Sequence, residues 1–141
     1  MKKEITGKTL GGEKRVYTFE IMDTETGLGL FYKYSGKIIE NENVRKMLNE
    51  GIEGTALDIM RLFPAVLSWD DIGYICKKTM AGATTKLDDG DTLEHDENGM
   101  AEYMTGDPME LFTALFYALL ANYPKYISPL LDAASLDSNQ E

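Results

Sequence analysis

Residues 107–123, DPMELFTALFYALLANY, carry the clearest helical pattern in the chain and decide its fold class. Asp107 is predicted to cap a helix, with Pro108 at the first helical position and Glu110 at the third. One face of this helix is an ordinary core stripe, made of Phe112, Leu115, Phe116, Leu119 and Tyr123.

The opposite side of the same helix is also apolar. It carries a strip of small residues, Ala114, Ala118 and Ala121, flanked by Tyr117 and Leu120. A helix that is apolar almost all round must be buried on both sides, by its own chain or by another one. We expect Ala114 and Ala118 to be internal and Tyr117 and Leu120 to contact a partner. An oligomer contact along the strip is the alternative.

The segment before this helix, residues 81–106, is polar, glycine-rich and acidic. It predicts a long loop or a small β-ribbon, with β-compatible pieces at residues 83–87 and 101–104. Further upstream, Ser68 followed by Asp71 is a helix-start signal. The helix that it opens would bury a stripe of Trp69, Ile72, Ile75, Cys76 and Met80.

The first half of the chain predicts a hairpin and three more helices. Residues 15–21 alternate at period two, and Gly11 and Gly12 supply a turn to a partner strand over residues 5–10. Helical spacing follows from Asp23 to Ile38, then over residues 43–50 and 55–63. We therefore expect an α+β fold: a mainly helical single domain over residues 1–134, with an N-terminal β-hairpin and a small β-ribbon before the last helix. A disordered tail is expected over residues 135–141.

The charge of the chain is strongly uneven. The formal net charge is −10, and residues 87–141 carry 12 acidic residues against a single basic one, Lys125. Such a surface repels phosphate, so nucleic acid is not expected as a partner. The longest apolar stretch has 11 residues, too few for a transmembrane helix, so no membrane is expected either. The N-terminus lacks a secretory signal, and the single cysteine fits a reducing compartment.

No motif predicts catalysis, a cofactor or a metal. The acidic loop fails the calcium-loop spacing, because counting from Asp89 places Leu93 and Glu94 where a ligand and a glycine are needed. Gly27 and Gly29 lack the third glycine of a dinucleotide fingerprint. Cys76 lies on an apolar helical stripe and is expected to be a buried thiol. His95, among acidic neighbours, is expected to be solvated and protonated.

Three stretches together resemble the phage tail assembly chaperone family of long-tailed bacteriophages and prophages. Residues 17–28, YTFEIMDTETGL, are similar to its opening strand and first-helix entry. Residues 67–72, LSWDDI, are similar to its mid-chain helix start. Residues 107–127 resemble its closing helix, which ends in asparagine-aromatic-x-x-aromatic, with Tyr123 and Tyr126 in place of the usual phenylalanines.

The resemblance implies a non-enzymatic protein that binds the tape measure protein and keeps it soluble until the tail tube polymerises around it. It implies action in the host cytoplasm and absence from the mature virion. The tail tube protein and a second copy of the chain are further candidate partners. The expected partner-binding residues are Leu111, Tyr117, Leu120, Tyr123 and Tyr126. The alternatives are a small structural tail component, such as a terminator or connector protein, and a small enzyme that uses Cys76 or the acidic loop.

Overall fold

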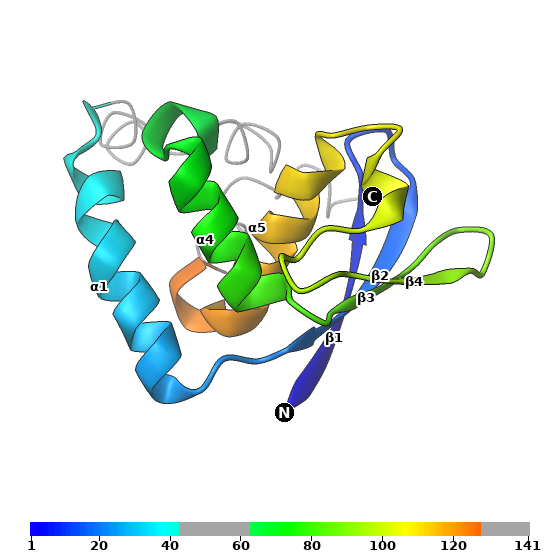
Figure 1. Ribbon diagram of the computed structural model, residues 1–141, viewed down its shortest axis with the longest axis horizontal. Coiled ribbons are helices and arrows are strands. Elements are labelled where there is room, and N and C mark those ends of the chain that lie inside the picture. Colours follow the sequence, from blue (N-terminus) through cyan, green and yellow to red (C-terminus); the bar gives the residue numbers. More distant parts are fainter. Residues whose placement is uncertain (43–62, 128–141) are drawn as a thin grey trace.

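The computed structural model describes residues 1–42 and 63–127 (Figure 1). In these residues four antiparallel strands form one sheet in the order β1-β2-β3-β4, and helices α4 and α5 pack against it. The predicted α+β class is confirmed. The helix predicted over residues 43–50, most of the one over 55–63 and the tail at 135–141 lie outside the described residues.

The N-terminal hairpin is formed by β1 (Lys2–Lys8) and β2 (Lys14–Glu20), as predicted. The strands pair along their whole length, from Lys2 opposite Glu20 to Lys8 opposite Lys14. Gly12 takes a φ of 86° in the connecting turn, a conformation that favours glycine. Tyr17 and Phe19 point to the same side of β2 and are fully buried. The period-two pattern of the sequence thus becomes the core face of the sheet.

The small ribbon consists of β3 (Thr84–Lys86) and β4 (Thr92–Glu94), and β3 pairs with β2. The ribbon therefore extends the hairpin into a four-stranded sheet. The strand predicted over residues 101–104 is wrong, since Glu102–Met104 form a 3₁₀ helix, η1. A tight turn between Leu87 and Asp91 brings β4 back beside β3. Residues 101–104 therefore cannot pair with β3, because β2 and β4 occupy its two edges.

Helices α1 (Thr24–Glu40) and α4 (Trp69–Met80) begin where the sequence predicts them. Ser68 and Asp71 form a reciprocal capping box, with N–O distances of 3.1 and 3.2 Å. The predicted stripe on α4 is buried except at Trp69, which is 65% exposed. Side chains tilt toward the N-terminus of a helix, so the side chain of this first residue extends past the core.

Helix α5 (Glu110–Asn122) begins two residues later than predicted, at Glu110 and not at Pro108. Asp107 does accept a hydrogen bond from the amide of Met109, at 3.1 Å, but residues 107–109 form a turn before the helix. Ala114, Ala118 and Ala121 are buried within the chain, so the internal interpretation of the small-residue strip is confirmed.

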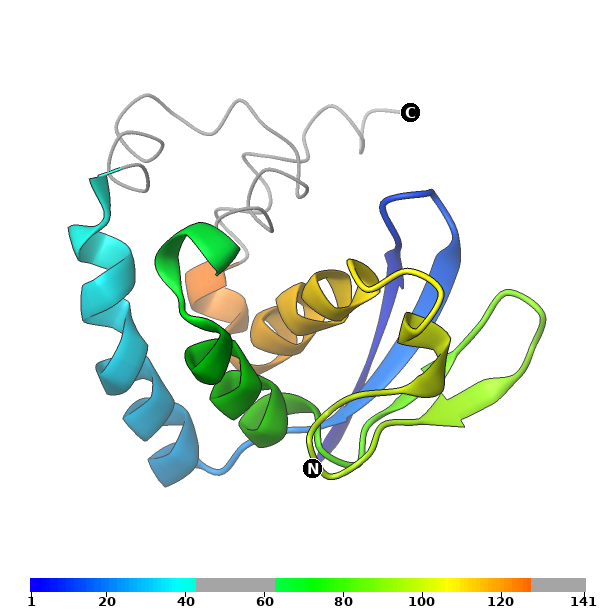
Figure 2. The same cartoon turned by 45° about the horizontal axis from the view of Figure 1, so that its top comes forward.

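The elements lie in order from the sheet outward: α5 next to the strands, then α4, then α1 at the outer edge (Figures 1 and 2). The core between sheet and helices is contributed mainly by β2, α4 and α5. Helix α1 adds only Leu30 and Tyr34 to the buried core, and its remaining described side chains are at least partly exposed. This outer position creates the pocket described next.

Candidate binding pocket

Helix α1 is attached to the rest of the fold near both of its ends. Near its start, the Tyr123 hydroxyl donates a hydrogen bond to the Gly27 carbonyl at 2.7 Å. Near its end, Lys37 forms a 3.0 Å ion pair with Asp71 of α4. Between these two attachments, the side of α1 that faces α5 is not fully packed.

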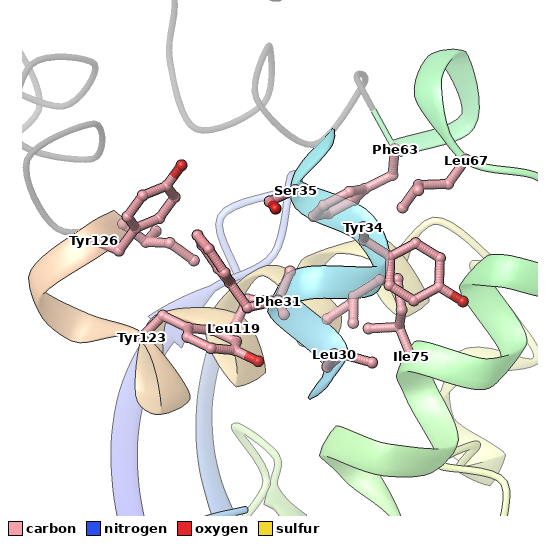
Figure 3. A pocket seen from close by; sticks show the side chains of 12 residues that line it. Leu30, Phe31, Tyr34, Ser35, Phe63, Leu67, Ile75, Leu119, Tyr123 and Tyr126 are labelled. Atoms are coloured by element: carbon pink, nitrogen blue, oxygen red, sulfur yellow. The ribbon is translucent and has the colours of Figure 1, made fainter. Parts of the chain in front are cut away.

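The space between α1, α4 and α5 is an apolar pocket of about 110 Å³, called here the α1–α5 pocket (Figure 3). Its walls come from five segments that are far apart in the sequence. The lining residues are Leu30, Phe31, Tyr34, Ser35, Phe63, Leu67, Ile75, Leu115, Leu119, Tyr123, Tyr126 and Ile127.

Aromatic rings form the wall nearest the C-terminal turn at residues 123–127. Phe31 meets Tyr126 edge-on with ring centroids 5.4 Å apart, and Tyr123 lies 6.5 Å from Phe31. Tyr126 is 54% exposed, so this wall reaches the molecular surface. Exposed aromatic side chains next to an apolar pocket are typical of surfaces that bind another apolar group.

The polar groups that line the pocket are hydroxyls. Burial raises the pKa of Tyr34 to about 12, with the Asp71 carboxylate adding to the shift, and burial also raises the pKa of Tyr123. Both phenols are therefore protonated at neutral pH. The remaining polar side chains among the lining residues are those of Ser35 and Tyr126.

The five predicted partner-binding residues do not lie together in the structure. Tyr123 and Tyr126 both line the α1–α5 pocket. Leu111 is buried in the core, Leu120 is half-buried, and neither lines the pocket. Tyr117 packs against β1 and β2: its ring stacks on Tyr17 at 5.4 Å, and its hydroxyl accepts a 3.3 Å hydrogen bond from the Lys8 amide.

Sequence reasoning missed the part of the pocket that α1 and residues 63–67 supply. Phe31 and Tyr34 do belong to the apolar pattern of the first predicted helix. That pattern shows that they lie on one helix face, and it does not show that the face is only partly covered. Phe31 is half-buried, and how far it is covered depends on where α1 lies relative to α5, which is a tertiary property.

Cys76 is buried, as predicted. Burial raises the pKa of its thiol to about 12, so the group is protonated at neutral pH. A buried, protonated thiol is a poor nucleophile.

The prediction that His95 is solvated and protonated is wrong. His95 is 4% exposed, and burial lowers its pKa. Its Nε2 lies 2.7 Å from the Thr85 hydroxyl and 3.2 Å from the Tyr103 hydroxyl, and its Nδ1 lies 3.0 Å from the Gly99 carbonyl. Leu93 and His95 alternate with Glu94 and Asp96, and this period-two signal could have indicated that His95 points inward.

No group of three or more His, Cys, Asp or Glu side chains that could hold a metal ion occurs among the described residues. Within the same residues, no helix is both long and apolar enough to cross a membrane.

Comparisons of the chain with protein-family models, with curated proteins and with solved structures returned no match.

Proposed function

We propose that this protein is a phage tail assembly chaperone that holds a helical segment of the tape measure protein in the α1–α5 pocket. The observation that carries the proposal is an apolar pocket with an aromatic wall that reaches the surface beside Tyr126. The resemblance of residues 17–28, 67–72 and 107–127 to that family supplies the partner. The chaperone acts in the host cytoplasm and leaves before the virion is complete.

The size of the pocket defines how a partner helix binds. An apolar cavity of about 150 Å³ holds a benzene ring, so a pocket of about 110 Å³ takes one large apolar side chain. Burying one such side chain is worth about 1.5–3 kcal/mol. Further apolar residues of the partner helix then pack along Phe31 and Tyr126, as in other complexes that seat a helix in a groove.

The net charge of −10 suits a protein that shields an aggregation-prone partner. High net charge keeps the complex soluble, and it attracts partner segments that carry lysine and arginine. Affinity then comes mainly from the apolar pocket, while the charge governs the rate of association.

The direct test is co-expression with the tape measure protein of the same phage or prophage, followed by a pull-down. Tyr126→Asp is the informative variant, because Tyr126 lines the pocket and is largely exposed. Leu10→Asp is the control, since Leu10 is an exposed apolar side chain in the turn between β1 and β2 and does not line the pocket.

We expect Tyr126→Asp to weaken binding at least about tenfold, the equivalent of about 1.4 kcal/mol, and Leu10→Asp to leave it unchanged. Equal binding by both variants and the unaltered chain would place the tape measure protein elsewhere on the surface. No binding by the unaltered chain would contradict the proposed function. Recovery of the protein from purified virions would instead favour a structural tail component.

A further inference from the structure

A second cluster lies away from the α1–α5 pocket, where β2 meets the start of α5. Arg15 of β2 and Glu110 of α5 form an ion pair, with 3.0 Å between Nη2 and Oε1. Both side chains are more than nine-tenths buried. A charged pair in this position must satisfy its remaining polar atoms inside the protein.

On each side of this ion pair, one polar atom has no hydrogen-bond partner among the described residues. Arg15 Nη1 donates to the Lys14 carbonyl at 3.1 Å, and Nη2 donates to Glu13 at 3.4 Å as well as to Glu110. Arg15 Nε and Glu110 Oε2 are buried without a hydrogen bond. Nε shares a carbon with Nη2, and Oε2 shares a carbon with Oε1, so both unpaired atoms flank the same 3.0 Å contact.

Two further buried hydroxyls have no hydrogen bond: those of Tyr17 and Thr113. Tyr17 is two residues from Arg15 on β2, which places both side chains on one face of the strand. Thr113 follows Glu110 by three residues on α5, which places these two on one face of the helix. The two faces meet, because Arg15 contacts Glu110.

Arg15 Nε and Glu110 Oε2 define the kind of ligand that would satisfy both of them. Nε–H is a donor, and the carboxylate oxygen is an acceptor. The ligand must accept from Nε–H and donate to Oε2, and the Arg15–Glu110 pair has no net charge for an ion to balance, so a small neutral molecule fits. A water molecule meets these conditions, and buried waters usually make two to four bonds to otherwise unpaired groups.

We propose that an internal water molecule bridges Arg15 Nε and Glu110 Oε2, and that these two atoms hold it without the Tyr17 and Thr113 hydroxyls. The water accepts from Nε–H and donates to Oε2. It converts a single-contact ion pair into a closed ring of hydrogen bonds between the hairpin and α5.

A crystal structure of the full chain at a resolution that shows ordered water tests this bridge. We expect one density peak within hydrogen-bond distance of both Nε and Oε2. A direct hydrogen bond between Nε and Oε2, or the two atoms without a peak between them, would overturn the proposal.

Nuclear magnetic resonance tests the bridge in solution. A long-lived water should give a cross-relaxation peak with the Nε–H proton of Arg15, and the absence of this peak would overturn the proposal. Hydroxyl protons that exchange with water can imitate the peak, so it is also measured in Tyr17→Phe and Thr113→Val. The peak should persist in both variants, provided that their amide spectra show the native fold. A peak lost in either variant arises from that hydroxyl and contradicts the bridge.

Discussion

Burial disfavours the charged form of His95, and its hydrogen bonds fix the tautomer of the neutral ring. The Gly99 carbonyl can only accept, so Nδ1 carries the proton and Nε2 accepts from the Thr85 hydroxyl. The Tyr103 hydroxyl lies 3.0 Å from the same Thr85 oxygen. These bonds satisfy a neutral imidazole, and burial lowers its pKa. His95 thus joins β3, the Gly99 turn and η1 as an uncharged group.

This neutral histidine should make the stability depend on pH. When the pH falls below about 6.5, the unfolded chain takes up a proton at His95 while the folded chain does not. The free energy of unfolding should therefore decrease as the pH falls from about 7.5 to 5.5. Urea unfolding across this range, for the unaltered chain and for His95→Gln, measures the effect. The chain has one histidine, so equal pH dependence in both proteins would contradict the assignment.

Gly7 leaves room for Tyr117. A Cβ placed on Gly7 would lie only 2.4 Å from the Tyr117 ring, whereas one placed on Gly11 meets nothing closer than 3.5 Å. Gly7→Ala should displace the ring from β1 and cost about 1–3 kcal/mol, as overpacked sites do. Gly11→Ala should change the free energy of unfolding far less. Chemical unfolding of the two variants tests whether Tyr117 secures α5 to the hairpin; equal effects would contradict that role.

At the level of elements, the two helix starts show which features the sequence can predict. The start of α4 is predicted correctly because its capping box joins Ser68 and Asp71, two residues of one local segment. The start of α5 is predicted two residues too early, although Asp107 and Pro108 form a good local signal. Glu110 instead turns inward to pair with Arg15, 95 residues earlier in the chain. A local pattern cannot reveal such a contact.

The small-residue strip of α5 lets other elements approach closely. Ala118 is fully buried within the chain. Ala118→Leu should therefore cost about 1–3 kcal/mol through overpacking, and any loss of tape-measure binding should follow from that instability. Ala81→Leu, at an exposed alanine just after α4, should be close to neutral. An unchanged thermal midpoint in Ala118→Leu, together with lost binding, would place the strip at an interface.

The acidic ribbon uses its carboxylates to cap its own turns. Asp89 accepts from the amide of Asp91 at 2.9 Å, and Asp96 accepts from those of Asn98 and Met100 at 2.8 and 3.0 Å. These carboxylates serve separate turns and do not converge on one point. Millimolar calcium, or its removal by a chelator, should leave the thermal midpoint unchanged, because calcium stabilises only a folded state that binds it. Sub-micromolar affinity by calorimetry would contradict this prediction.

For the molecule as a whole, the candidate site depends on assembly more than on any motif. The hairpin, the ribbon and the starts of α1 and α4 could be predicted from local periodicity and capping. The α1–α5 pocket could not, because α1, residues 63–67, α4, α5 and the C-terminal turn each supply only a few of its side chains. Of the predicted partner-binding residues, Tyr123 and Tyr126 line this pocket because the C-terminal turn brings them next to Phe31.

Binding through the apolar pocket and binding through the acidic surface predict different effects of salt on the affinity for the tape measure protein. If affinity comes from the pocket, raising the salt from about 0.1 to 0.5 M should slow association and reduce the affinity for the tape measure protein less than about threefold. If the acidic residues beyond position 87 formed the binding surface, screening should reduce the affinity at least about tenfold over this range. Surface plasmon resonance separates these two possibilities, because it resolves association from dissociation.

The Tyr126→Asp variant provides a second measurement. It should dissociate faster at every salt concentration, since the substitution alters the pocket wall. A steep salt dependence combined with unchanged dissociation of Tyr126→Asp would move the binding site from the pocket to the acidic surface.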